Sequence, residues 1–390
     1  MKTKQKKRLF ESLKKLTDYR VDSHKILYPI EEVVFIVLFA IIKGKTTYET
    51  MHTWMEFNKE NSLLKRIFNK EELRIPSRAT IHRIMINIDF NELERIFRDY
   101  FSKYKTESIS VDGKWLRGSD VNGNYTQESH KAMLNILDKE HKIVIGHKFL
   151  HKGKKKSEIP NFNELLDEKE LFSKESQIFS FDALLTQKEI LNKINKNNQR
   201  YIAKVKGNQE SLRNQVIEVV EDLKEATTIC EDKGFNTEGG KEVKRKVEVF
   251  QSNSCDIVLF NSEFNNIQSI IKITKTIIDK AKVKKEKVEY LIANFKTTAK
   301  DFKLKILQHW RVETYHYHLD MLTKEDEHIA YIEPFSISIL RSFTINFYQI
   351  FFNKYKGEKI ITSKPLTMAR VKEYSVNSDE FALNLFEECV

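Results

Sequence analysis

The spacing of apolar and polar positions over the first part of the chain is typical of helices. Residues 33–42 form a continuous apolar run, as a buried helix would, and residues 46–57 form a second helical segment. A Pro-Ser turn at residues 76–77 precedes a third, and Asp89-Phe90-Asn91-Glu92 is a capping box that opens a fourth. The pattern therefore predicts a helical domain over residues 1–104.

After residue 104 the pattern changes to strands. Five runs alternate or are apolar enough for strands: ESISVDG, MLNIL, KIVIGHKFL, QIFSFDA and YIAKVKGNQ. Polar residues 138–141 join the second run to the third, which predicts a hairpin. A helix is expected near residues 160–168, and residues 186–189 match a capping box for another. Strands, a hairpin and then alternating helix and strand predict a mixed α/β sheet over residues 105–211.

The periodicity weakens in the Lys-rich stretch 212–295, where strand-like pieces are mixed with loop. We interpret this stretch as a β-rich insertion. A long helix is expected from Thr298 to about Met321 and a last helix over residues 335–355, so residues 296–356 form a helical segment. The tail, residues 357–390, is expected to be loosely organised.

The charge of the chain favours a polyanionic partner. The formal net charge is +11 over 390 residues, and Lys or Arg that neutralise phosphates release counterions from DNA. AT-rich coding sequence explains part of this positive charge equally well, because it favours Lys, Asn and Ile codons and all three residues are abundant here. The three cysteines include no CxxC pair, which argues against a zinc finger or a disulfide framework. The longest apolar run is about half of what a bilayer span needs, so a soluble intracellular protein with no membrane association is expected.

Two acids follow strand-like runs. Asp112 and Asp182 each end an otherwise apolar run, and side chains at strand ends lie in the crevice where open α/β sheets bind ligands. Asp is also common at strand ends because it favours turns. Two such acids on neighbouring strands are harder to explain in that way. Their hard oxygens suit Mg²⁺ or Mn²⁺.

A further acid lies on the expected long helix. His309, Glu313, His316 and Asp320 are spaced so that they share one helix face. An ordinary polar face gives the same spacing. Glu313 and His316 also match the Glu-x-x-His pattern of di-iron bundles, which occurs twice elsewhere in the chain in unlike surroundings.

Five stretches resemble, in the right order, motifs of bacterial insertion-sequence DDE transposases of the ISAs-type, H-repeat-associated family: VDGKWLRGS, KKSEIPNFNELLD, FSFDALLTQKEI, YIAKVKGNQ and HWRVE. Near the N-terminus, LTDYR, IPSRATIHRIM and DFNELERIF resemble the leading domain of that family. The resemblance covers nearly the whole chain. It implies a ribonuclease-H-like catalytic core made of residues 105–211 and 296–356, with the insertion before the last catalytic helix. The Asp-Asp-Glu triad of that core falls on Asp112, Asp182 and Glu313.

The resemblance also implies an activity. The protein is expected to cleave phosphodiester bonds at element ends and to join 3′-hydroxyl ends to target DNA, using two Mg²⁺ or Mn²⁺ ions held by the triad. His309 and Asp320 are possible auxiliary residues. Its partners are expected to be double-stranded DNA, both terminal inverted repeats and target, bound by a homodimer in the bacterial cytoplasm near the nucleoid. A catalytically lapsed DNA-binding descendant and a metal-dependent nuclease remain alternatives.

Polar residues beside these motifs are candidate DNA contacts. Those that flank the acids in sequence are Lys114, Arg117, Lys206, Asn208 and Gln209. Arg78 and Arg83 lie on the short helix after the Pro-Ser turn and are candidates for reading the element ends, because Arg binds guanine bidentately. An ordinary solvated basic face explains these two residues equally well.

Overall fold

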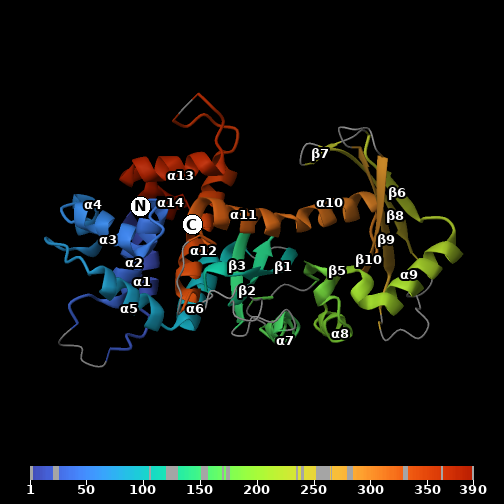
Figure 1. Cartoon of the computed structure of the whole chain (residues 1–390), viewed down its shortest axis with the longest axis horizontal. Coiled ribbons are helices and arrows are strands. Elements are labelled where there is room, and N and C mark those ends of the chain that lie inside the picture. Colours follow the sequence, from blue (N-terminus) through green and yellow to red (C-terminus); the bar gives the residue numbers. More distant parts are fainter. Residues whose placement is uncertain are drawn as a thin grey trace. The chain divides into compact units, whose positions relative to one another are not determined.

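The structure is a computed structural model. It describes residues 3–20, 26–104, 107–119, 131–150, 157–168, 171–172, 176–233, 236–238, 241–251, 264, 266–278, 284–327, 333–361 and 363–388. The chain forms two compact units (Figure 1). Unit 1 consists of Met1–Tyr104, Gly113–Lys154 and Glu313–Val390, and unit 2 of Lys105–Asp112 and Lys155–Val312. The helices of the first 104 residues therefore pack together with two later segments of the chain.

Unit 1 begins with the helices that the apolar spacing predicts. They are α1 (Thr3–Leu13), α2 (Ile30–Ile42), α3 (Tyr48–Phe57), α4 (Ser62–Phe68), α5 (Arg78–Asn87) and α6 (Phe90–Phe101), followed by the short η2 (Ser102–Tyr104). Every residue of α2 from Val33 to Ile42 is buried, as its continuous apolar run requires. Ser77 caps α5 through the backbone N–H of Thr80, as the Pro-Ser turn suggests.

The later described residues of unit 1 form a buried hairpin and four further helices. The hairpin pairs β2 (Ala132–Asp138) antiparallel with β3 (Ile143–Leu150), and η3 (Arg117–Ser119) precedes it. The later helices are α11 (Arg311–Thr323), α12 (Phe335–Tyr355), α13 (Met368–Asn377) and α14 (Asp379–Glu388). Helix α12 is buried from Phe335 to Phe351, and the Tyr348 hydroxyl donates to the carbonyl of Ile42 at 2.8 Å. A helix buried all round is the centre of its unit.

A buried polar network joins four elements of unit 1. The His147 ring on β3 lies 2.6 Å from the Glu94 carboxylate on α6 and 3.0 Å from the Ser342 hydroxyl on α12. Tyr315 on α11 donates to Ser342 at 2.7 Å. Because each of these polar atoms is paired, the network fixes the position of α11 against the hairpin and α12.

Unit 2 is built on a mixed sheet. Its strands, in spatial order, are β1 (Ser108–Trp115), β4 (Ile178–Phe181), β5 (Arg200–Val205), β10 (Lys284–Ala293), β9 (Ser269–Ile278), β8 (Lys241–Phe250) and β6 (Thr228–Glu231), with β7 (Asn236–Glu238) on β8. Strands β1, β4 and β5 are parallel, and those from β10 onward are antiparallel. Strand β1 continues into unit 1, where its neighbour is β2. The predicted mixed α/β class is confirmed, and the order β3-β2-β1-β4-β5 agrees with a ribonuclease-H-like core.

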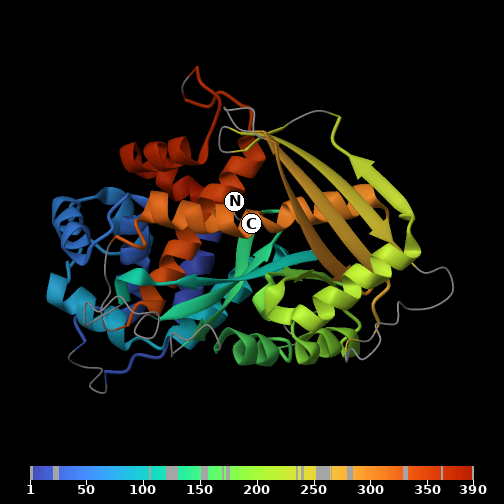
Figure 2. The same ribbon diagram turned by 45° about the vertical axis from the view of Figure 1, so that its right-hand side comes forward.

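The described residues of unit 2 include four α-helices. They are α7 (Glu158–Leu165), α8 (Lys188–Lys196), α9 (Glu210–Leu223) and α10 (Ala299–His309), with the short η5 (Ala183–Leu185) and η6 (Gly207–Gln209). Strands β6–β10 confirm the predicted β-rich insertion, although residue 212, its predicted first residue, lies inside helix α9. Figures 1 and 2 show α10 and α9 on opposite faces of the long insertion strands. On the α10 face, Val247, Ile271 and Leu291 pack with Phe302.

Several local predictions are wrong. The tail from residue 357 is not loosely organised, because α13 and α14 bury one face each and Phe386 stacks on Phe35 at 5.5 Å. The expected helix from Thr298 to Met321 is two helices, since α10 ends at His309 and α11 begins at Arg311. Strand β1 does not end at Asp112. It continues to Trp115, because it also pairs with β2 of unit 1.

Two expected capping boxes are also incomplete. Asp89 caps α6, but the Glu92 side chain accepts hydrogen bonds from Thr17 instead of completing the box. Thr186 does not cap α8, because its hydroxyl donates to the carbonyl of Lys204 at 2.8 Å. In both places a tertiary hydrogen bond takes the side chain from its local role.

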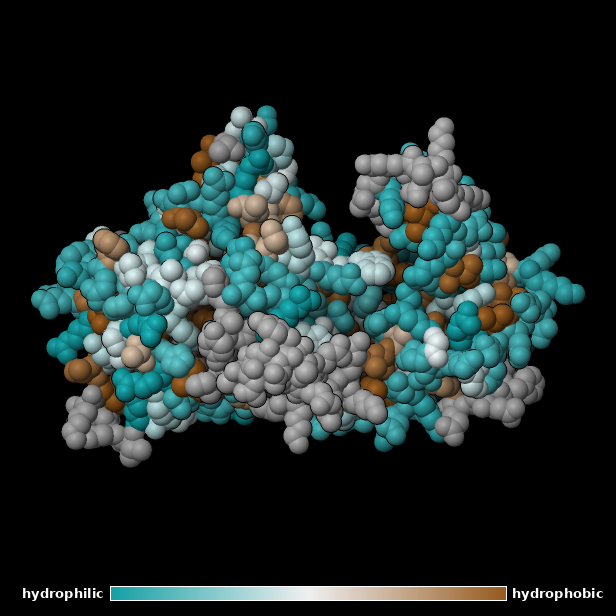
Figure 3. Space-filling view, viewed as in Figure 1, coloured by the Kyte–Doolittle hydropathy of each residue, from teal (hydrophilic) through white to brown (hydrophobic). Residues whose placement is uncertain are grey.

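The surface is mostly polar on the face seen in Figure 3, where the described hydrophobic residues form only small patches. Within the described part of the chain, no helix is both long and apolar enough to span a bilayer.

Candidate active site

Asp112 on β1 and Asp182, the residue directly after β4, lie at corresponding places relative to two neighbouring parallel strands of unit 2. Strands β1 and β4 pair in register from Ser108 with Ile178 to Ser110 with Ser180. Each Asp lies two residues beyond that last pair. Neighbouring strands are about 4.8 Å apart, and the carboxyl ends of parallel strands meet at the same edge of a sheet. The register therefore brings the two acids to one edge, although β1 itself continues past it.

The Asp182 carboxylate is half-exposed and is bound by a lysine. The Lys206 ammonium, just after β5, donates to its two oxygens at 2.9 and 3.3 Å. Burial alone would raise the pKa of Asp182, but the hydrogen bond and charge of Lys206 and the backbone N–H of Ala183 hold that pKa below its usual value. Asp182 is thus an ionised carboxylate that already attracts a cation.

The Lys-Gly-Asn-Gln segment after β5 supports the loop that follows Asp182. The Asn208 amide donates to the carbonyl of Ala183 at 2.9 Å, and the Gln209 amide donates to Gln187 at 3.2 Å. Together with Lys206, these residues tie η6 to η5. Their structural partners are therefore residues of the chain itself, and their DNA contacts stay predictions.

A hydrogen-bond chain, which sequence inspection missed, runs beside the two acids. The Ser110 and Ser180 hydroxyls lie 3.3 Å apart, and the Ser180 hydroxyl lies 2.9 Å from Nδ1 of His309 at the end of α10. Both serines are buried. The signal was the repeated Ser-x-Asp pattern, SVD at 110–112 and SFD at 180–182. The predicted auxiliary residue His309 is thus bound to β4, two residues before Asp182.

Glu313 lies in unit 1, in the first turn of α11, and its side chain is exposed. An acid in the first turn of a helix is favoured by the helix dipole. Two side-chain contacts hold α11 in unit 1 besides Tyr315: His316 lies 2.9 Å from Asn135 on β2, and Asp320 accepts from Lys114 at 2.7 Å. Within the described residues, no three His, Cys, Asp or Glu side chains are gathered as a ready metal cage.

A DNA contact would lie at the surface, but Lys114 is buried. Its side chain is only 6% exposed, and its ammonium lies 2.7 Å from Asp320 and 3.4 Å from Asp326. Burial alone would lower the pKa of Lys114, but Glu325 and these two acids outweigh that effect and raise the pKa. Lys114 therefore ties β1 to the predicted auxiliary residue Asp320 on α11. Arg117 is 75% exposed, 3.8 Å from Asp326.

Comparison with known proteins decides the family. A family model described as Transposase DDE domain matches residues 104–328, and a model described as DDE_Tnp_1-associated matches residues 10–101. This chain belongs to the transposase DDE domain family. It is a transposase, a DNA-binding enzyme that cleaves and transfers DNA. No curated protein matches it. It is similar to a chain of the piggyBac transposase synaptic complex with hairpin DNA, over 99% of this chain and 81% of that chain, with a TM-score of 0.44 and 11% identity.

The two arginines predicted to read element ends lie on α5 of the transposase. Both side chains are exposed, and Arg78 lies 3.6 Å from the exposed Glu49. The backbone carbonyl of Arg83 accepts a hydrogen bond from the Tyr19 hydroxyl at 3.3 Å, and the Arg83 guanidinium takes no part in that bond. Their exposure suits the predicted role and equally suits a solvated basic face.

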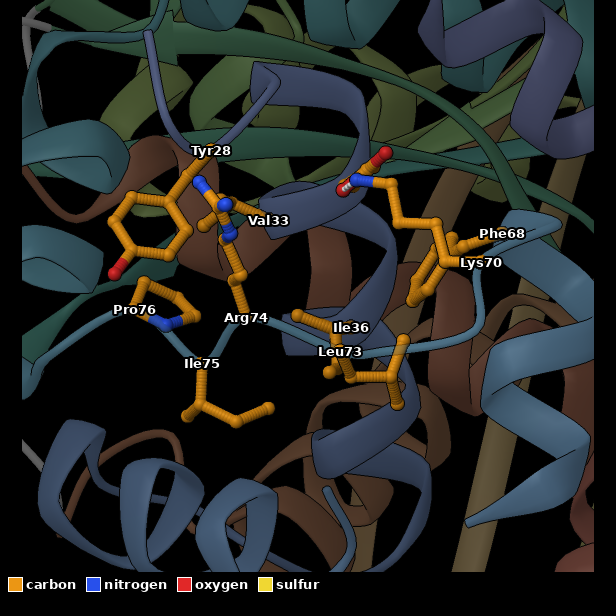
Figure 4. Close-up of a pocket in the computed structure, with 10 residues that line it drawn as sticks. Tyr28, Val33, Ile36, Phe68, Lys70, Leu73, Arg74, Ile75 and Pro76 are labelled. Carbon is orange, nitrogen blue, oxygen red and sulfur yellow. Dashed lines mark hydrogen bonds and ion pairs between the residues drawn. The ribbon is translucent and has the colours of Figure 1, made fainter. Parts of the chain in front are cut away.

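A pocket lies just before α5, between α2 and residues 68–76 (Figure 4). Apolar side chains such as Val33, Ile36 and Leu73 line it. The Arg74 side chain lies beside Tyr28, and Lys70 donates to Glu32 at 2.6 Å. No residue of the predicted triad lines this pocket, so its contents do not bear on the site at Asp182.

Proposed function

We propose that the transposase hydrolyses phosphodiester bonds at the ends of its element and joins the 3′-hydroxyl ends to target DNA, with Asp112, Asp182 and Glu313 holding two Mg²⁺ or Mn²⁺ ions. The observation that carries this proposal is the register of β1 and β4. Asp112 and Asp182 each follow the last residue pair of that register, Ser110 with Ser180, by two positions. We further propose that a homodimer binds the terminal inverted repeats.

Chain connectivity supports Glu313 as the third acid. His309, which is bound to Ser180 on β4, lies four residues before Glu313. Four residues reach at most about 14 Å even when fully extended. Glu313 thus follows closely in sequence after a residue that is bound to Ser180, and this supports its assignment as the third acid.

The donor set fits a hard divalent cation. All three side chains offer carboxylate oxygens, which Mg²⁺ and Mn²⁺ prefer. The pKa of Asp182 is held low, so its carboxylate is charged at neutral pH, and its half-exposed position leaves it accessible. When bound, such ions activate the attacking oxygen and stabilise the leaving oxygen of an in-line displacement.

The residues around the acids have positioning roles in this proposal. Lys206 keeps Asp182 ionised and oriented, and Asn208 fixes the loop that carries it. The Ser110–Ser180–His309 chain sets β1, β4 and the end of α10 in one register. Lys114 links β1 to α11 through Asp320. Held groups of this kind lower the barrier because little reorganisation remains for the reaction.

Replacing Asp182 by Asn tests the proposal. The amide keeps the shape of the side chain but removes the charge that holds a hard cation. We expect Asp182→Asn to abolish Mg²⁺-dependent cleavage of duplexes carrying the DNA that flanks the coding sequence, while their binding to the protein is retained. Calorimetry with Mn²⁺ alone should show the loss of metal binding.

Asp167→Asn is the matched control. Asp167 is also an exposed Asp paired with a lysine of unit 2, since Lys193 donates to it at 2.7 Å, but it follows a helix and not a strand of the sheet. This variant should cleave like the wild type. Cleavage by Asp182→Asn at the wild-type rate would show that the reaction takes place elsewhere.

A further inference from the structure

Helix α11 carries large apolar side chains on two opposite faces. Tyr315 and Leu319 are buried in the interior of unit 1, whereas Tyr317 is 59% exposed and Met321 is 49% exposed. Burial stabilises an apolar side chain only as far as it removes that side chain from water. Tyr317 and Met321 therefore add little to the stability of unit 1, and their place on the exposed face has another explanation.

The exposed face of α11 also carries the predicted third acid. Glu313 lies four residues before Tyr317, and Tyr317 lies four residues before Met321. Residues four apart in a helix share a face, with their Cβ atoms about 5–6 Å apart. A carboxylate, an aromatic ring and a thioether thus follow one another along one exposed strip. We call Tyr317 and Met321 the platform.

The chemistry of the platform suits a flat apolar ligand. An aromatic ring offers a rigid apolar face, and a methionine side chain adapts to the shape of what it contacts. Neither side chain carries the positive charge that would bind a phosphate. In DNA, the flat apolar surface is the face of a base, and aromatic side chains stack on bases that are unpaired. A single exposed hydrophobic residue needs no explanation, but this pair shares its face with the predicted third acid.

We propose that Tyr317 and Met321 stack against an unpaired base beside the phosphate that is cleaved. The proposal rests on the proposed function, which brings a DNA strand to Glu313, and it adds the surface that holds a base of that strand. A base taken out of the duplex loses its stacking partners there, and the Tyr317 ring replaces one of them. Because every base has such a face, this contact tolerates any sequence.

Replacing Tyr317 by Ala and by Phe tests the platform. The measurement is the affinity of the full-length protein, with Mg²⁺ present, for a short single strand of arbitrary sequence that contains 2-aminopurine, whose fluorescence falls on stacking. We expect Tyr317→Ala to bind this strand at least about fivefold more weakly, as the loss of one base–aromatic stack predicts, and to quench it less. Tyr317→Phe keeps the ring and should behave like the wild type. The affinity for a fully paired duplex should be the same in all three proteins.

Phe57→Ala is the matched control. Phe57 is also an exposed aromatic residue of unit 1, at the end of α3, and is 84% exposed. Both alanine variants should keep the thermal midpoint of the wild type, since Ala favours an exposed helix. The control should bind the single strand like the wild type.

Three results would overturn the platform. The first is equal single-strand binding by Tyr317→Ala and Phe57→Ala. The second is weak binding by Tyr317→Phe, which would assign the contact to the hydroxyl. The third is a change of oligomeric state in Tyr317→Ala with unchanged binding, which would make this face a contact between protein copies. If the wild type does not cleave DNA that flanks the coding sequence, the proposed function fails and the platform with it, whereas wild-type cleavage together with any of the three results refutes the platform alone.

Discussion

Acidification is expected to destabilise unit 1 through His316 on α11. Burial, and then the positive charge of Lys114, lowers the pKa of His316 from its usual 6.5 to about 3. The hydrogen bond at 2.9 Å explains the preference for the neutral ring, because the Asn135 amide nitrogen is a donor and Nε2 must accept. Protonation would turn this acceptor into a second donor.

The size of the effect follows from proton linkage. The unfolded chain binds a proton at His316 as the pH falls below 6.5, whereas the folded state does not until the pH approaches about 3. The contribution of neutral His316 to the free energy of unfolding is therefore fully present above about pH 6.5. Below that pH the free energy of unfolding falls by up to about 1.4 kcal/mol per pH unit. At about pH 5.5, His316 alone should lower the free energy of unfolding by about 1.4 kcal/mol.

Urea unfolding of the wild type and of His316→Gln, at neutral pH and at about pH 5.5, measures this cost. Glutamine remains polar and does not titrate, so the two proteins should differ in the pH dependence of their stability by the amount above. Parallel pH profiles for the two proteins would refute the reasoning.

Two further substitutions test residues of the site and of α5. Ser180→Ala removes the hydrogen bond to His309 and should cost about 1 kcal/mol of stability; it should slow cleavage without changing DNA affinity, whereas Ser211→Ala on the exposed side of α9 should do neither. Wild-type cleavage by Ser180→Ala would exclude a positioning role. Replacing Arg78 and Arg83 together by Ala should lower the preference for element-end DNA over random DNA at least about tenfold, with no loss of fold stability since both are exposed. An unchanged preference would assign end recognition to another segment.

The fold was predictable wherever one periodicity ran long enough. The bounds of α12, 335–355, were predicted correctly because its apolar character is continuous. Helices α13 and α14 were missed because they are short and rich in polar residues, and their buried faces gain meaning only from a partner such as Phe35. The break at Trp310 was missed as well, since no Pro or Gly marks it.

The site was predictable in its acids and much less in their surroundings. Motifs located Asp112, Asp182 and Glu313, but a basic residue next to an acid in sequence was interpreted as a DNA contact. For Lys114 the structure gives another role, because its partner Asp320 lies 206 residues away. Ser110 and Ser180 were overlooked for a similar reason, since neither hydroxyl has significance until the strands are paired. Local pattern identifies the groups, and the long-range pairing decides what they do.

The discontinuity of unit 1 has a consequence for its synthesis. The apolar helix α2 leaves the ribosome early, yet its contacts include Tyr348 of α12, which is made 306 residues later. Contacts this distant in sequence form late and delay folding. Unit 1 is therefore complete only when nearly the whole message has been read, and a polypeptide released early would lack both Glu313 and the helix that α2 packs on. Truncated copies of the gene should yield degraded and inactive protein, so that only an intact element produces an enzyme able to move it.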